Sequence, residues 1–193
     1  MGTLSIEEKR KVRKPLLWVG IASIIMTFAG LTSGYVVSRS ALQVENMWLV
    51  FELPVQFYWA TGVMLLSSGT IIFAKRAAKK NNQRELKISL LITLILGLGF
   101  SVLQFFGAAD LKSRGLFFTG LGSSTSVSWV YVIAFLHWLH VISGIIVLIV
   151  TFLRSLKGAY SSSDHHGLDI SAIYWHFLDV LWVYLFLFMV FIR

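Results

Sequence analysis

Residues 174–182 of the chain read YWHFLDVLW. This segment lies inside an apolar run over about residues 171–192, which is long enough to cross a bilayer as an α-helix. His176 and Asp179 are three residues apart, and Trp175 and Trp182 are seven apart, so each pair shares one face of that helix. Asp179 is the only acidic residue in any apolar run of the chain. A carboxylate in the middle of a membrane costs about 2.5–3.5 kcal/mol, so we expect neighbouring groups to compensate for it.

The composition indicates a polytopic membrane protein rather than a soluble domain. Of the 193 residues, 56% are hydrophobic, and the mean hydropathy is +0.76. The chain has no cysteine, which excludes disulfides and thiolate metal sites. The first apolar run begins near Leu16, is long enough to span the membrane and lacks a small-residue cleavage pattern, so no cleavable signal is expected.

Five apolar runs predict an all-α fold, a bundle of five transmembrane helices forming one membrane domain over residues 1–193. Thirteen of the 17 basic residues lie in the N-terminal segment and in the second and fourth connections. The positive-inside rule therefore predicts an inside N-terminus and an outside C-terminus. The net charge of +8 is interpreted as an orientation signal and a surface for anionic lipid, not as a nucleic-acid site. The expected helices cover about residues 16–37, 54–74, 86–106, 128–153 and 171–192.

Small residues recur within these helices. Gly30 and Gly34 form a G-x-x-x-G pair in the first helix, which allows another helix to approach closely. Comparable small residues in the second and fourth helices are interpreted in the same way, as packing positions rather than ligand sites. They are Ser67, Ser68, Gly69, Ser143 and Gly144.

Three histidines are predicted at membrane depth: His137 and His140 in the fourth helix, and His176 in the fifth. Such residues serve as haem or metal ligands, in proton relays, or as packed hydrogen-bonding groups. His140 lies roughly 21 Å from the inner end of its helix and His176 about 9 Å from the inner end of its own. A haem held by two histidines needs both at one depth. Asp179 lies about 7 Å in depth from His140, and both a structural hydrogen bond and a proton-transfer role remain open for it.

The segment at 174–182 resembles the Tyr-Trp-His-Phe-x-Asp-x-x-Trp signature in the last transmembrane helix of subunit III of the haem-copper respiratory oxidases. Residues 137–144 (HWLHVISG) are similar to that family's His-x-x-His-Val-x-x-Gly segment in the preceding helix. Residues 26–35 and 54–68 resemble its first two shared helices. The likeness extends from about residue 16 to residue 193.

The resemblance implies a subunit of a cytochrome c or quinol oxidase in the aerobic respiratory chain, placed in the bacterial inner membrane. Its expected partners are the haem- and copper-bearing subunit I, subunit II and further respiratory-complex subunits. Such a subunit has no catalytic residue, redox centre or metal ligand of its own; it stabilises subunit I, binds phospholipid and supports proton uptake, proton translocation and durable turnover. The structural, lipid-contacting or interface candidates are Gly30, Gly34, His137, His140, Trp175, His176, Asp179 and Trp182.

The chain departs from the family pattern in two respects. Many members have seven helices, and the two that are missing here would be N-terminal, as in shorter bacterial forms. The family often places a glutamate after an Ala-Ser pair in its first shared helix, but Ile24 follows Ala22 and Ser23 here, so the role of that carboxylate does not carry over.

Two other classes of protein remain as alternatives. A haem-b-binding membrane anchor of a quinone oxidoreductase predicts histidines paired in depth. A small transporter or channel predicts internal repeats or broken helices in matching positions. The sequence shows neither pattern.

Overall fold

The computed structural model describes residues 6–120, 123–162 and 164–192, and it describes side chains from residue 12 onward. Within these ranges the chain is helical, without strands, and each of the five helices is long and apolar enough to cross a membrane. This confirms the predicted all-α, five-helix membrane protein. The helices are α1 (Ile6–Val44), α2 (Val55–Lys79), α3 (Gln83–Ser113), α4 (Thr125–Leu156) and α5 (His166–Phe191).

The helices continue beyond the apolar runs that mark them in the sequence. Hydrophobicity marks only the part of a helix that lies in hydrocarbon, whereas the backbone hydrogen bonds continue into the polar ends. Polar side chains cap the starts of two helices: Asn82 accepts a hydrogen bond from the backbone N–H of Glu85 at the start of α3, and Ser124 accepts one from that of Val127 at the start of α4.

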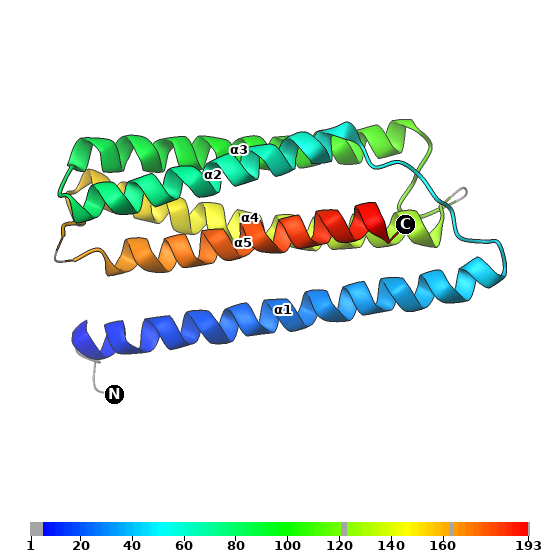
Figure 1. Cartoon of the computed structure of the whole chain (residues 1–193), viewed down its shortest axis with the longest axis horizontal. Coiled ribbons are helices and arrows are strands. Elements are labelled where there is room, and N and C mark those ends of the chain that lie inside the picture. The colour runs from blue at the N-terminus through cyan, green and yellow to red at the C-terminus, as the bar shows by residue number, and fades with distance from the viewer. Residues whose placement is uncertain (1–5, 121–122, 163, 193) are drawn as a thin grey trace.

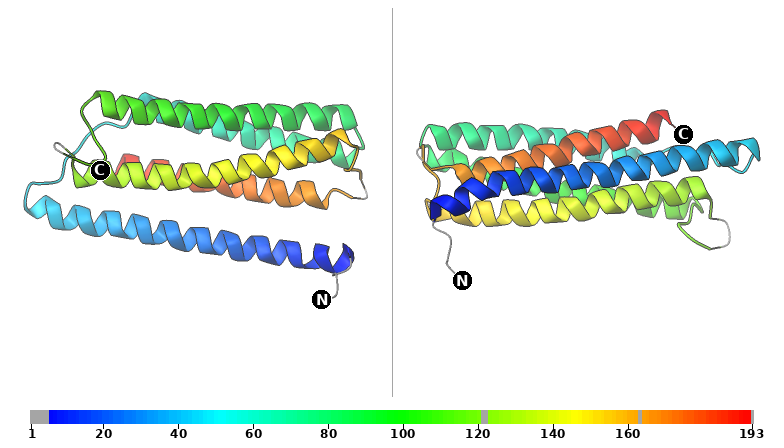
Figure 2. Two further views of the ribbon diagram at one scale, coloured as in Figure 1. Left: turned by 180° about the vertical axis from the view of Figure 1, so that it is seen from behind. Right: turned by 90° about the horizontal axis from the view of Figure 1, so that it is seen from below.

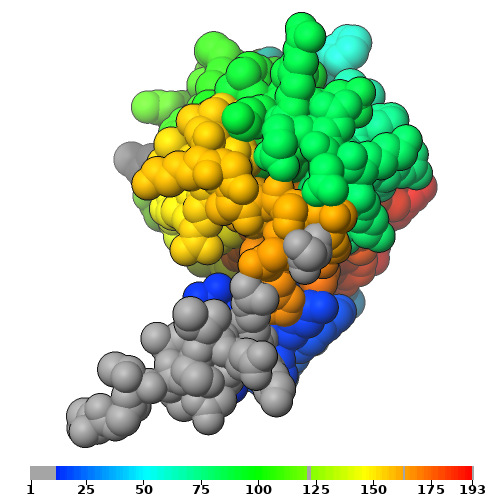
Figure 3. All heavy atoms as spheres, turned by 90° about the vertical axis from the view of Figure 1, so that its left-hand side faces the viewer, coloured from blue at the N-terminus to red at the C-terminus, as the bar shows by residue number. Residues whose placement is uncertain are grey.

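Successive helices run up and down, so the connections alternate between the two ends of the bundle (Figure 1). The start of α1 and the α2–α3 and α4–α5 connections lie together at one end, which Figure 3 views directly. The segments that hold most of the basic residues are therefore gathered at a single end, as the positive-inside argument requires. The side of the membrane that this end faces stays a prediction.

Polar contacts join the two connections at this basic end. The side chain of Asn81 donates to the Ser162 hydroxyl and accepts from the Ser162 backbone N–H, at 3.0 and 2.7 Å. The Gln83 amide donates to the carbonyl of Tyr160 at 2.6 Å. These bonds tie the α2–α3 connection and the start of α3 to the α4–α5 connection.

Helix α1 lies apart from the other four (Figure 2). It packs only on α4 and α5 within the described residues, whereas α2 and α3 pack along their lengths and α5 contacts α2 and α4 as well. Only 17% of the most apolar stretch of α1 is buried in the bundle, compared with 50% for α5. The architecture is thus a core of four helices, α2 to α5, with α1 packed against one side of it.

Candidate functional site

Within the 174–182 segment, Trp175, His176 and Trp182 face α2, and their partners on α2 are small hydroxyl side chains. Helices α2 and α5 are antiparallel, so positions near the end of α2 meet positions near the start of α5 (Figure 1). Thr61 and Ser68 are seven residues apart and share a face of α2, just as Trp175 and Trp182 share a face of α5. We call this contact, formed by Thr61, Ser67, Ser68, Trp175, His176, Asp179 and Trp182, the α2–α5 seam.

Trp175 joins three helices to α5. Its indole N–H donates to the Ser67 hydroxyl at 3.0 Å, and its ring is fully buried. The ring packs against Gly97 of α3, where a Cβ atom would lie 2.7 Å from it, and against Gly144 of α4, where a Cβ atom would lie 3.2 Å from it. The Ser67 hydroxyl in turn donates a hydrogen bond to the backbone carbonyl of Thr93 on α3, at 3.3 Å. The indole is therefore satisfied in the membrane interior, as a buried N–H requires.

Trp182 repeats this arrangement two turns later. Its indole N–H donates to the Thr61 hydroxyl at 2.9 Å, and its ring is also fully buried. The ring is tilted by 32° to that of His137 and lies edge-on to that of Phe100, with centroids 5.1 and 5.2 Å away. The two tryptophans that the sequence predicts on one face are thus both hydrogen-bonded to α2.

Ser68 brings His176 and Asp179 together. Its hydroxyl forms a short hydrogen bond with Nδ1 of His176, and the Asp179 carboxyl lies beside both groups. Asp179 is only 5% exposed, and its Oδ1 has no hydrogen-bond partner among the described residues. In a hydrolytic triad the imidazole lies between the hydroxyl and the carboxylate. Here the Ser68 hydroxyl of α2 bonds the His176 imidazole of α5, and among the described residues no hydrogen bond or ion pair joins His176 to Asp179. The contact therefore holds two helices together and lacks the second bond of a triad.

His137 and His140 lie away from this cluster. His137 is fully buried among aromatic rings, and neither of its nitrogens has a hydrogen-bond partner among the described residues. His140 bonds through Nδ1 to the Leu136 carbonyl at 2.7 Å and packs its ring on Phe28 of α1, with centroids 5.7 Å apart. His140, which the sequence places about 7 Å in depth from Asp179, thus faces α1 rather than the Ser68–His176 contact.

The membrane histidines therefore do not converge. Within the described part of the chain, no three His, Cys, Asp or Glu side chains are grouped closely enough to hold a metal ion.

The two glycines of the G-x-x-x-G pair differ in their surroundings. A Cβ atom at Gly34 would lie 2.8 Å from the ring of Trp129 on α4, so this glycine admits a neighbouring side chain. A Cβ atom at Gly30 would have nothing within 4 Å, and Gly30 lies on the exposed face of α1. Close approach within the chain thus uses Gly34, while Gly30 leaves a smooth surface outside.

Sequence reasoning missed the partners of the signature. Ser67 and Ser68 are interpreted above as packing positions, yet they hydrogen-bond Trp175 and His176, and Gly97 is not singled out at all. The presence of the hydroxyl residues Thr61, Ser67 and Ser68 within one apolar helix, and of two tryptophans within another, is the sequence signal that points to this contact.

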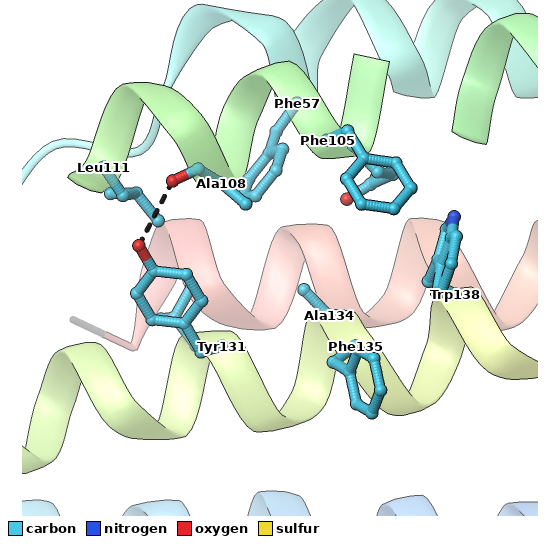
Figure 4. Close-up of a pocket in the computed structure, with 10 residues that line it drawn as sticks. Phe57, Phe105, Ala108, Leu111, Tyr131, Ala134, Phe135 and Trp138 are labelled. Carbon is cyan, nitrogen blue, oxygen red and sulfur yellow. Dashed lines mark hydrogen bonds between the residues drawn. The ribbon is translucent and has the colours of Figure 1, made fainter. Parts of the chain in front are cut away.

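A second feature absent from the sequence-based expectations is an apolar pocket of about 140 Å³ between α3 and α4 (Figure 4). Phe57, Phe105 and Trp138 line it, and Tyr131 borders it with a hydroxyl that donates to the Ala108 carbonyl at 3.2 Å. It lies at membrane depth and exposes almost no polar atoms.

Known proteins with similar sequences identify the family of this chain. Residues 20–192 match the family described as cytochrome c oxidase subunit III. Cytochrome c oxidase subunit 3 of Loxodonta africana is 37% identical over 130 residues, which are 66% of this chain and 46% of that protein. Cytochrome c oxidase subunit 3 of Spodoptera frugiperda is 33% identical over 142 residues, which are 69% of this chain and 88% of that protein.

The rat protein of the same name, from Rattus norvegicus, is 36% identical over 129 residues, 65% of this chain and 46% of its own length. The chain thus spans about half the length of most of these relatives. The match nevertheless covers all five helices from residue 20 onward, including the whole α2–α5 seam. The chain belongs to the cytochrome c oxidase subunit III family.

Proposed function

We propose that this chain is subunit III of a terminal haem-copper oxidase, a cytochrome c oxidase of the aerobic respiratory chain. In this role it has no redox centre, packs on the catalytic subunit I next to subunit II, and stabilises subunit I during turnover. The observation that carries the proposal is the α2–α5 seam. Trp175, His176 and Trp182 of the family signature are hydrogen-bonded to hydroxyls of α2, which supports an architectural role for the signature rather than a chemical one.

The surface of α1 supports a role within a larger membrane complex. Large apolar side chains on this helix are well exposed, among them Trp18 at 58% and Met26 at 75%. A helix that buries so little of itself has room to pack on another subunit and on phospholipid. The smooth surface at Gly30 fits the same use.

The charge distribution supports a location in a bacterial inner membrane with the basic end in the cytoplasm. That end would then face the side from which an oxidase takes up protons, which is where support for proton uptake and translocation is needed. Reporter fusions after Lys80 and after Ser113 should report opposite sides of the membrane. Reports from the same side would contradict the five-span orientation.

The role in turnover is tested by removing the chain. An oxidase depleted of it should keep its haem spectrum and reduce oxygen at first, and then lose activity faster than the intact complex. The loss should grow with the number of turnovers rather than with time at rest. Oxygen consumption by intact and depleted complexes is compared under identical lipid and donor conditions.

Two results would contradict the proposal. If the depleted complex at once loses both all of its activity and a haem signal, this chain holds a cofactor. Identical decay of the two samples would restrict its role to assembly or docking.

A further inference from the structure

A groove of about 410 Å³ runs between α2 and α3 at the basic end of the bundle. The small, buried Ala77 of α2 lines it, as does Ser89 of α3. Its sides are apolar where they face the membrane, with Phe73 at 58% and Ile88 at 48% exposure. Arg76 and Lys80 line its polar end.

The two cations of the groove are available to a ligand. Within the described part of the chain, neither Arg76 nor Lys80 forms an ion pair with a carboxylate. Their neighbour Lys75, by contrast, is paired with Asp169 of α5 at 3.0 Å. Glu85 is the one acidic residue lining the groove, so with Arg76 and Lys80 the lining carries a net positive charge.

The cations lie at the depth of lipid headgroups. Arg76 is in the last turn of α2, and its guanidinium lies over the ring of Phe73, 5.6 Å from the centroid. Phe73 is one turn closer to the membrane interior. The groove therefore changes from cationic to apolar along the membrane normal, as a phospholipid changes from phosphate to acyl chain.

We infer that this groove binds one anionic phospholipid of the leaflet at the basic end, with its phosphate on Arg76 and Lys80 and an acyl chain along Phe73 and Ile88. The inference deepens the phospholipid binding included in the proposed function and rests on it. The apolar walls favour a lipid over free phosphate, which would leave them unused. The opposite end of α3 lacks this arrangement, because Arg114 is engaged there by Asp110.

The test uses the purified oxidase complex, stripped of loosely held lipid and incubated with phosphatidylglycerol, phosphatidylcholine or inorganic phosphate. Native mass spectrometry counts the lipids and subunits retained. The Arg76→Gln/Lys80→Gln variant is compared with Lys79→Gln/Arg84→Gln, which removes the same charge from exposed residues of the same hairpin that do not line the groove.

Wild type and the control variant should retain one phosphatidylglycerol in preference to phosphatidylcholine. The groove variant should bind it about 30-fold more weakly, the effect of two cations near a membrane surface. Equal weakening in both variants, equal binding of phosphatidylcholine, or displacement of the lipid by inorganic phosphate would overturn the inference.

Loss of a partner subunit from the groove variant alone would assign the groove to that subunit instead. A complete set of subunits without lipid preference refutes this inference only, whereas a wild-type preparation that contains no oxidase partner refutes the proposed function. Both readings come from the same spectrum.

Discussion

Helices α5 and α1 both cross the membrane, but they are held by different means. Helix α5 buries half of its most apolar stretch and hydrogen-bonds through Trp175, His176 and Trp182 to hydroxyls of α2. Helix α1 buries 17% and meets α5 through Thr32, which accepts from the Tyr184 hydroxyl at 3.3 Å, and through the ring of Tyr35 on Phe188. It meets α4 through the ring of Phe28 on His140.

The difference shows how polar groups are distributed in a membrane subunit. Lipid tails are as apolar as the helix surfaces, so close packing and hydrogen bonds hold membrane helices together. The expensive groups, including the carboxyl of Asp179, are concentrated where α5 has close neighbours on both sides. Helix α1 carries none of them inside its apolar run, so it can present a surface to lipid or to another subunit.

The largest effect is expected for Trp175→Ala. This change empties a fully buried site between α2, α3 and α4 and leaves the Ser67 hydroxyl without its donor. The free energy of unfolding should fall by about 3–5 kcal/mol, measured by detergent-induced unfolding in mixed micelles.

Trp59→Ala is the matched control, because that indole is 68% exposed on the outer face of α2. It should change stability by less than about 0.5 kcal/mol. Equal losses in the two variants would remove the distinction between the seam and the lipid-facing surface.

A smaller effect is expected for Gly97→Ala. The added Cβ would lie 2.7 Å from the Trp175 ring, so the ring or α3 must shift, at a cost of about 1–3 kcal/mol. Gly30→Ala on α1 adds the same atom where nothing lies within 4 Å. It should leave the unfolding of the isolated chain unchanged or slightly improved. A loss in the intact complex alone would locate a partner helix at Gly30.

The seam also marks the limit of prediction from the sequence. Runs of apolar residues determine the five helices and the gathering of basic segments at one end, because both depend on local composition. The face shared by Trp175 and Trp182 follows from helical periodicity alone. Their partners do not, because Thr61 and Trp182 are 121 residues apart and meet only through the packing order of the helices. The same holds for Gly97, whose role depends on a ring from another helix.

Asp179→Asn keeps the shape and hydrogen-bonding capacity beside Ser68 and His176, so it should assemble normally. Asp179→Leu leaves those polar groups without this neighbour and should destabilise the chain by about 1–3 kcal/mol, seen as weaker attachment to the complex. If Asp179→Asn assembles normally but abolishes proton uptake, the carboxyl serves as a proton relay and the architectural role is wrong.

The smallest effect is expected where α1 meets α5. Tyr184→Phe removes only the hydroxyl that donates to Thr32, and hydrogen bonds between membrane helices contribute about 0.6 kcal/mol on average. Ser143 and Tyr174 form the equivalent contact between α4 and α5 at 2.6 Å, so Tyr174→Phe removes one hydroxyl from the core instead. Both variants should unfold within about 1 kcal/mol of wild type. Their local effects should differ, because α1 has few other contacts to hold it in place. Hydrogen exchange of backbone amides should therefore increase in α1 after Tyr184→Phe, while Tyr174→Phe leaves α5 protected by its bonds to α2. Increased exchange of α5 in the second variant would mean that the seam does not hold the core on its own.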